Sequence, residues 1–192
     1  MARRSDHSRD QLAQMVIEAA RAITLKDGWR AVTMRGIAGR IGYAAGSIYN
    51  AVGDIDAVLL RVNADTLERL AAKLDAASRG DGEARVLALA DAYMTFVAAH
   101  APLWSALMER PPPAQAPDWY AGPRARLLDI VAAAVSPFYP DPKSCRRAVL
   151  ALWAALQGVA ALSAGGNLAF AGKFEPRDIA RSIVKRYLSG RE

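Results

Sequence analysis

The sequence predicts an all-α protein of about nine helices, in which three small N-terminal helices precede a larger helical domain. Apolar residues recur at the three- and four-residue spacing of a helix face along nearly the whole chain, and no stretch reads as a convincing strand. Clusters of glycine and proline interrupt this pattern and separate the helices. Hydrophobic residues make up 53% of the 192 residues, which is enough to bury a sizeable core.

Three helices are expected near the N-terminus, each with one apolar face. These faces are Leu12, Val16, Ala19, Ala20 and Ile23 in the first helix, Met34, Ile37, Ala38 and Ile41 in the second, and Ile48 and Val52 in the third. Asp27-Gly28 closes the first helix, and Gly42 closes the second because glycine tolerates the positive φ of a C-cap. Two short helices joined by such a turn form a helix-turn-helix, whose second helix enters the DNA major groove.

The remaining elements follow clear breaks. A long connecting helix is expected over residues 54–78, with Asp54 as its N-cap, and the stretch at 78–82 ends it. Residues 86–97 are apolar on most sides, which indicates a helix inside a larger core. The pattern continues with a short segment at 103–108 and helices over 118–135, 143–164 and 176–189.

Residues 33–52 resemble the DNA-binding segment of the TetR family of bacterial transcriptional regulators. The positions that match its pattern are Thr33, Ile37, Ala38, Gly42, Gly46, Ser47, Ile48 and Tyr49. The family shares the expected layout, so the resemblance implies a helix-turn-helix DNA-binding domain over 1–53 and a helical effector-binding and dimerisation domain over 54–192. An ordinary helical hairpin is the alternative, but the packing of such a hairpin does not require Ser47, Tyr49 and Asn50 to be exposed together.

Two stretches resemble one C-terminal subgroup of that family. Residues 152–160 resemble its Trp-x-x-x-His-Gly segment, with Gln157 where histidine is usual. Residues 100–104 resemble its His-Pro-x-x-Trp stretch, with an alanine inserted.

The resemblance and the side-chain chemistry together identify candidate DNA contacts. These are Arg3, Arg4, Thr33, Arg35, Ala44, Ala45, Gly46, Ser47, Tyr49 and Asn50. The Ser47 and Tyr49 hydroxyls suit phosphate oxygens, and Gly46 lets the backbone approach DNA closely. Asn50 suits either an adenine edge or the DNA backbone. The arginines at positions 3 and 4 form either a basic arm on DNA or a disordered tail.

Four positions depart from the family pattern. Ala44 stands where a helix-capping serine is usual, and Ala45 stands where a longer polar side chain often reads a base. Val52 replaces an aromatic residue, and Ile55 replaces a lysine that commonly meets a phosphate. We therefore expect few base contacts, with alanine methyl groups against thymine methyl groups and DNA shape supplying selectivity.

Aromatic and sparse polar residues of the second domain predict an effector pocket. The candidates are Tyr93, Phe96, Trp104, Met108, Trp119, Trp153 and Gln157. Pockets for small molecules are mostly apolar with a few orienting polar groups, so the expected effector is small and largely apolar. Ordinary core packing is the alternative for each residue.

The last two helices predict a homodimer interface. Small residues recur at three- and four-residue spacing at Ala148, Ala151, Ala155 and Gly158, and the final helix adds Ile179, Ile183 and Tyr187. In TetR-like proteins the matching helices form a four-helix interface between subunits. The alternative is that the small residues face a helix of the same subunit.

Charge and composition limit the other classes of function. The net charge of +6 is concentrated near the N-terminus, which suits a polyanionic partner. The single Cys145 excludes a disulfide framework, and the N-terminus lacks the apolar region of a signal peptide. The apolar runs are interrupted short of the roughly 20 residues of a membrane span, so no membrane association is expected. No metal-binding, cofactor-binding or catalytic motif is present, so no metal, cofactor or enzyme activity is expected.

These observations predict a cytoplasmic, ligand-responsive transcriptional repressor. We expect it to bind a palindromic double-stranded operator as a homodimer and to be released by a small apolar effector. A ligand-binding protein of the same fold with weakened or lost operator recognition is one alternative. An all-α enzyme that uses the same cavity is the other.

Overall fold

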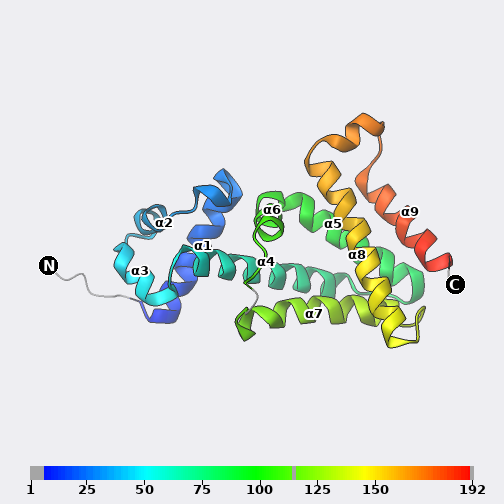
Figure 1. Cartoon of the computed structure of the whole chain (residues 1–192), viewed down its shortest axis with the longest axis horizontal. Helices are drawn as coiled ribbons and strands as arrows, with labels where there is room; N and C mark the ends of the chain where they lie inside the picture. The colour runs from blue at the N-terminus through cyan, green and yellow to red at the C-terminus, as the bar shows by residue number, and fades with distance from the viewer. Residues whose placement is uncertain (1–6, 114–115, 191–192) are drawn as a thin grey trace. The chain divides into compact units, whose positions relative to one another are not determined.

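The computed structural model describes residues 7–113 and 116–190, and within them it contains nine α-helices and no strand (Figure 1). The predicted all-α class is therefore confirmed. The chain forms two compact units. The N-terminal unit comprises Met1–Thr66 and His100–Tyr120, and the C-terminal unit comprises Leu67–Ala99 and Ala121–Glu192. The predicted division after residue 53 stays a prediction.

The N-terminal unit is built from the first four helices and α6. Its elements are α1 (Arg9–Asp27), the 3-10 turn η1 (Trp29–Ala31), α2 (Met34–Ile41), α3 (Ala45–Val52), the first part of α4 (Ile55–Ala77) and α6 (Ala101–Glu109). Its core includes Val16, Ile37, Ile48 and Val58, none of which is accessible to solvent, and Leu103 of α6 joins them. The segment expected at 103–108 is thus a helix whose apolar side packs in the core of the N-terminal unit.

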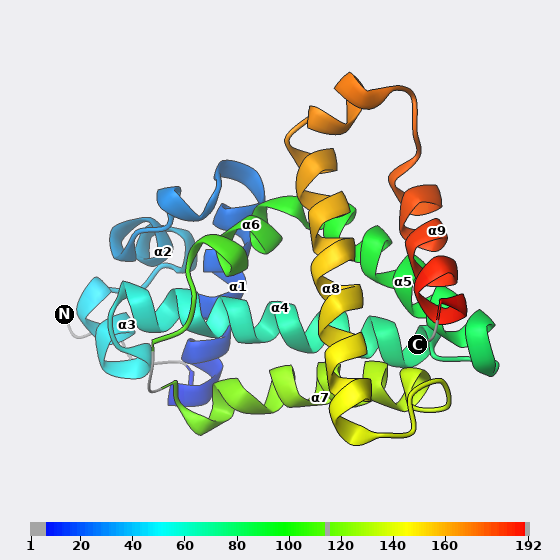
Figure 2. The same ribbon diagram turned by 45° about the vertical axis from the view of Figure 1, so that its right-hand side comes forward.

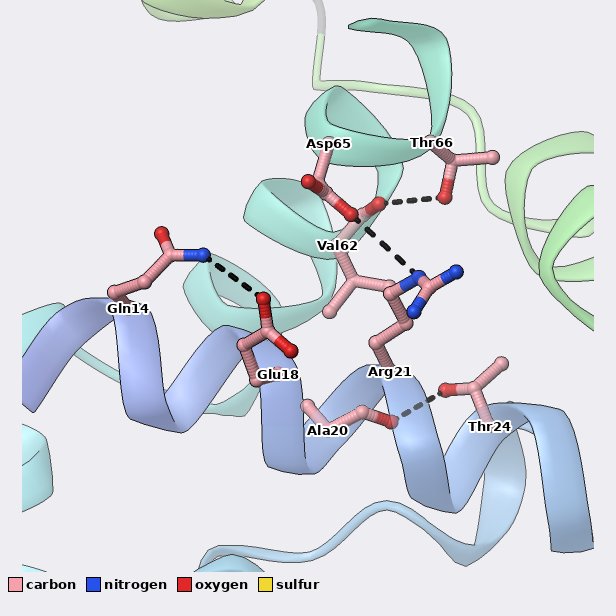
Figure 3. A network of polar contacts seen from close by, with 8 residues as sticks. All are labelled: Gln14, Glu18, Ala20, Arg21, Thr24, Val62, Asp65 and Thr66. Atoms are coloured by element: carbon pink, nitrogen blue, oxygen red, sulfur yellow. Dashed lines mark hydrogen bonds and ion pairs between the residues drawn. The ribbon is translucent and has the colours of Figure 1, made fainter. Parts of the chain in front are cut away.

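One ion pair joins α1 to α4 beside this core, and hydrogen bonds within each helix lie around it (Figure 3). The Arg21 guanidinium lies 3.7 Å from a carboxylate oxygen of Asp65. The buried hydroxyls of Thr24 and Thr66 donate to the carbonyl oxygens of the residues four positions earlier in their helices, at 2.9 and 2.8 Å. These bonds satisfy polar groups that would otherwise be costly inside the core.

Capping residues set the helix ends close to the predicted positions. The Thr33 side chain accepts from the Gly36 N–H at 3.0 Å at the start of α2, and Gly42 ends it in the left-handed conformation with φ 75°. The Asp54 carboxylate accepts from the Ala57 N–H at 2.8 Å at the start of α4. Ala44 is the N-cap of α3 and provides no side-chain bond, so the expected missing cap is confirmed.

The C-terminal unit contains the remaining helices. These are the second part of α4, α5 (Gly82–Ala99), most of α7 (Asp118–Val135), α8 (Pro142–Ala164), the 3-10 turn η2 (Asn167–Ala171) and α9 (Pro176–Ser189). α9 packs against both α5 and α8, and Figure 2 shows it alongside them. The buried residues Ala180, Val184 and Leu188 form the inner face of α9. The Arg181 guanidinium pairs with Asp91 of α5 at 2.7 Å.

α8 departs from one expectation. By length and composition α8 could cross a membrane. The sequence pattern predicts instead that every apolar run is too short for a membrane span. The core helix of a soluble protein meets the same criteria, and α8 packs against α5 and α9. Only 33% of its apolar window is buried, because apolar residues also occupy its outer side. The outer side of α8 therefore needs a separate explanation.

The missing cap of α3 gives a stability prediction. Ala44 has φ −72° and ψ 142°, close to the backbone of Ser8, which caps α1. Ala44→Ser should therefore satisfy a free N–H of α3 and raise the free energy of unfolding by about 1 kcal/mol. Urea denaturation followed by circular dichroism measures this. Ala45→Ser, one position inside the helix, is the control, and an equal gain from both variants would contradict the capping explanation.

Candidate nucleic-acid interface

The helix-turn-helix is held together by buried aliphatic side chains on both of its helices. Ile37 of α2 and Ile48 of α3 are inaccessible to solvent, and Val52 is almost as deeply buried. Gly42 closes α2 by donating its N–H to the Ala38 carbonyl, and α3 begins three residues later. Val52, which replaces an aromatic residue in the family pattern, therefore serves as a core residue.

The opposite side of α3 is exposed and carries the predicted contacts. The exposed residues at the start and on the outer side of this helix are Ala44, Ala45, Gly46, Ser47, Tyr49 and Asn50. Thr33 and Arg35 of the preceding segment are exposed too, so the structure leaves all the described candidates accessible. The Tyr49 side chain is 61% exposed, although it is aromatic. Arg3 and Arg4 lie outside the described residues.

The surroundings of Gly46 support its predicted role. A Cβ atom added at Gly46 would meet nothing within 4 Å, so packing inside the protein does not require a glycine there. Its backbone also lacks the positive φ that favours glycine. Gly46 therefore faces open space outside α3, and its close approach to DNA stays a prediction.

Unpaired cations lie beside this surface. Arg35 and Arg40 are exposed, and neither guanidinium has a hydrogen bond or an ion pair with another described residue. By contrast, Arg21 pairs with Asp65, and Arg30 pairs with Glu109. The two arginines of α2 are therefore available for phosphate oxygens, which bind guanidinium groups in a bidentate manner.

His7 contributes a contact that the sequence analysis missed. Its Nδ1 lies 2.6 Å from the hydroxyl of Tyr43, which belongs to the turn between α2 and α3. The two residues are 36 positions apart, and no local pattern relates them. This bond holds His7 against the turn of the helix-turn-helix.

The start of α4 offers no cation to DNA. Ile55, which stands where the family has a phosphate-binding lysine, is partly buried and packs against the core of the N-terminal unit. Its acidic neighbours are already engaged: Asp54 caps α4, and Asp56 pairs with Arg110 at 2.5 Å. Their charges are thus partly offset.

A second cluster joins the C-terminal end of α6 to η1. Glu109 accepts from the Trp29 indole N–H at 3.2 Å and from Arg30 at 2.8 Å, and the Arg110 guanidinium lies 5.0 Å from the Trp29 ring centroid. Hydrogen bonds from Ser105, and next from the Trp29 indole, lower the pKa of Glu109. The carboxylate therefore stays ionised, and it ties α6 to the segment that precedes α2.

The predicted effector-binding residues fall into both units. Tyr93, Phe96, Trp153 and Gln157 belong to the C-terminal unit, and Trp104, Met108 and Trp119 belong to the N-terminal unit. Tyr93, Phe96 and Trp104 are buried, whereas Met108, Trp119 and Trp153 are at least one-third exposed. The exposed ring of Trp119 lies 5.1 Å from the Arg61 guanidinium.

Three of these residues meet between α5 and α8. The Tyr93 hydroxyl donates to the Gln157 side-chain oxygen at 2.7 Å. Burial strongly raises the pKa of Tyr93. A hydrogen bond with the Trp153 side chain lowers this pKa, but by less. The phenol is therefore neutral at physiological pH and acts as a hydrogen-bond donor among apolar residues. No group of three or more His, Cys, Asp or Glu residues that could hold a metal ion occurs in the described parts of the chain.

The predicted dimer residues wind around α8. Ala148 is 1% exposed and packs inside its own unit, so it is not available to a partner. Ala151 and Ala155 are partly buried, and Gly158 is exposed. The row therefore turns from the inside of the unit toward solvent along α8. The exposed apolar surface of α8 only partly coincides with this row. It consists of Leu150, Trp153, Ala154, Gly158, Ala161 and Leu162. Ile179, Ile183 and Tyr187 of α9 are partly buried.

Comparisons with known proteins agree with this fold. Residues 16–62 match the family described as bacterial regulatory proteins, tetR family, and residues 86–187 match the one described as tetracyclin repressor-like, C-terminal domain. The chain is 26% identical over 156 residues to Rv0681, an uncharacterised HTH-type transcriptional regulator of Mycobacterium tuberculosis; the match covers 80% of this chain and 70% of that protein.

Two solved structures illustrate the similarity of fold. A protein of unknown function from Rhodococcus sp. RHA1 has a TM-score of 0.82 and 22% identity, with 98% of both chains covered. The transcriptional regulator FadR from Bacillus subtilis, in complex with stearoyl-CoA, has a TM-score of 0.71 and 13% identity, with 93% of this chain and 99% of that chain covered. The resemblance read from residues 33–52 is confirmed by the family match, whereas the Trp-x-x-x-His-Gly subgroup stays a prediction.

The exposed Tyr49 hydroxyl gives a test of phosphate anchoring. Tyr49→Phe removes one donor and should weaken binding by about 1 kcal/mol, or roughly fivefold, on every DNA sequence. Fluorescence anisotropy with DNA upstream of the gene and with a scrambled duplex measures both affinities. A loss on the upstream DNA alone would show that Tyr49 reads bases instead.

Proposed function

Because the chain belongs to the TetR family of transcriptional regulators, we propose that it is a ligand-responsive repressor that acts in the cytoplasm. It binds a palindromic operator as a homodimer, and a small, largely apolar effector releases it. The observation that carries this proposal is the exposed side of α3. That surface combines two hydroxyl groups, a glycine without a packing role and the neighbouring unpaired guanidinium groups of α2.

The outer side of α8 supports the proposed dimer. Leu150, Trp153 and Leu162 are 47%, 45% and 49% exposed, and small residues lie between them. A contiguous apolar strip of this kind is costly in water and marks an interaction surface. α9 differs, because its exposed positions include Arg177, Arg181, Lys185 and Arg186. We therefore centre the proposed interface on α8 and remove Ala148 from it.

The cluster between α5 and α8 supports the proposed effector site. Tyr93 and Gln157 provide a polar pair among apolar neighbours, as orienting groups in ligand pockets do. Trp153 joins the same cluster and lies on the proposed dimer surface. FadR of Bacillus subtilis, which shares the fold, was solved with stearoyl-CoA. A ligand with an acyl chain is therefore a suitable first probe for this protein.

The proposed coupling uses α4 and α6. α4 is one continuous helix whose first part belongs to the N-terminal unit and whose second part belongs to the C-terminal unit. The Glu109 cluster ties α6 to η1, directly before α2. These helices have two arrangements, and an effector that binds one of them more tightly than the other shifts the protein toward it. This shift changes the spacing of the two recognition helices in the dimer. Because two half-sites about one helical turn apart require a fixed spacing of those helices, the protein then releases DNA.

One observation favours a second candidate function. Ala44, Ala45 and the inward-facing Ile55 leave few side-chain donors on the DNA-facing side. A ligand-binding protein of the same fold that has lost operator recognition would show this pattern. Titration of DNA upstream of the gene at several salt concentrations separates the two functions. A repressor prefers that DNA to a scrambled duplex, and either stearoyl-CoA or a small apolar ligand reverses the binding. Equal, weak affinity for both duplexes favours the second function.

The alanine at position 45 allows a direct test of the DNA-facing geometry. Ala45 is exposed at the first position of α3, so Ala45→Lys should add one phosphate contact. Non-specific affinity should rise, and the slope of log K against log salt should steepen by about one. An unchanged slope would place residue 45 away from the DNA.

The dimer surface can be tested without disturbing the subunit. A Cβ at Gly158 meets nothing within 4 Å, so Gly158→Leu does not clash within its own chain. In a dimer centred on α8 it should overpack the interface, at a cost of about 1–3 kcal/mol counted twice by symmetry. Light scattering should then show monomers at micromolar concentration, with the helical circular dichroism retained.

Gly122→Leu is the matched control for this substitution. Gly122 also lies within a helix, and a Cβ there also meets nothing within 4 Å. This variant should remain dimeric. If Gly158→Leu also remains dimeric but melts at a lower temperature, Gly158 contributes to the stability of the subunit and not to an interface.

A further inference from the structure

A cleft in the C-terminal unit has no role in the proposed binding of DNA or of the apolar effector. It has a volume of about 600 Å³, within the usual range for small-molecule sites. The residues that line it come from the loop before α8, the first turns of α8 and the end of α9: Tyr139, Ser144, Arg147, Ile183, Arg186, Tyr187 and Gly190. None of the predicted effector-binding residues is among them. Two residues predicted for dimerisation, Ile183 and Tyr187, line this cleft.

The charge of the cleft is positive. Arg147 of α8 and Arg186 of α9 both line it, and no acidic residue within the described ranges 7–113 and 116–190 does. Neither guanidinium has a hydrogen bond or an ion pair with another described residue. Elsewhere in the same unit, Arg126 pairs with Glu68 and Asp75, and Arg181 pairs with Asp91. Two unpaired cations that face one cleft repel each other, and an anion bound between them would remove that repulsion.

The other polar groups around the cleft are already engaged. The Tyr139 hydroxyl donates to the Tyr187 carbonyl oxygen at 3.0 Å. The Ser144 N–H donates to the Asp141 carboxylate at 2.8 Å, and this bond, followed by one from the Ser144 hydroxyl, lowers the pKa of Asp141. Asp141 also feels the charge of Arg147, but as the smallest of these effects. The guanidinium groups thus remain as the main polar groups for a ligand.

The walls of the cleft suit an organic group. The rings of Tyr139 and Tyr187 lie 6.0 Å apart at 42°, and Ile183 adds an aliphatic surface. The hydrogen bond between the two tyrosines holds the Tyr139 ring in place. A planar substituent can lie against such rings while its anionic end meets the arginines.

We propose that this cleft is a second ligand site, which binds a small phosphomonoester with a planar organic group. Arg147 and Arg186 hold the phosphate, because guanidinium groups form paired hydrogen bonds with its oxygens. The tyrosine rings and Ile183 contact the organic part. The cleft shares no lining residue with the cluster of Tyr93, Trp153 and Gln157, so its ligand is distinct from the proposed apolar effector.

Calorimetric titration of the full-length protein tests this proposal in the absence of DNA. The probes are phenyl phosphate and inorganic phosphate at constant ionic strength. We expect phenyl phosphate to bind with a dissociation constant in the millimolar range or below, and several-fold more tightly than inorganic phosphate. Arg147→Gln and Arg186→Gln should each weaken phenyl phosphate binding about tenfold or more, since each removes a charged hydrogen-bonding group.

Neighbouring cations provide matched controls. Arg146→Gln and Lys185→Gln remove the same charge from the same helices, but neither residue lines the cleft. These variants should keep the wild-type affinity within about twofold, and circular dichroism confirms that all four variants are folded. An equal loss in all four variants would overturn the proposal, because it would indicate general electrostatic attraction. Absence of phenyl phosphate binding, or equal affinity for both probes, would overturn it as well.

Discussion

The orientation of the proposed DNA-binding surface depends on the burial of Ile48. With Ile48 and Val52 in the core of the N-terminal unit, the 3.6-residue period of α3 turns Ser47, Tyr49 and Asn50 outward. Ile37 supports Ile48 from α2, and the left-handed Gly42 sets the turn between the helices. The stability of this unit and the presentation of its recognition helix therefore have the same physical cause.

The two C-terminal helices differ in what their outer sides require. α8 exposes large apolar residues such as Leu150 and Leu162, and a second copy of the chain would remove them from water. The exposed side of α9 is rich in cations, and its last turns contribute Arg186 to a positively charged cleft. A surface of the first kind suits subunit association, and one of the second kind suits an anionic ligand.

The sequence predicts the helices well because local signals mark their ends. Gly28, Gly42, Asp54 and Asp141 lie at helix termini in the structure, and apolar spacing identifies the inner sides of α1, α2 and α3. Periodicity is less informative for α8, because apolar residues occupy both its inner and its outer side, and of the predicted row only Ala148 is buried in its own unit. Contacts between distant residues left no local signal: Trp29 and Glu109 are 80 positions apart, and Tyr93 and Gln157 are 64 apart.

Two copies of the exposed α3 surface should bind DNA together. DNase footprinting of the wild-type protein on the DNA upstream of its gene measures this. We expect two protected half-sites related by a two-fold axis, with centres about 10 base pairs or a multiple of that apart. Protection of a single half-site, or no protection at concentrations where the protein is dimeric, would contradict it.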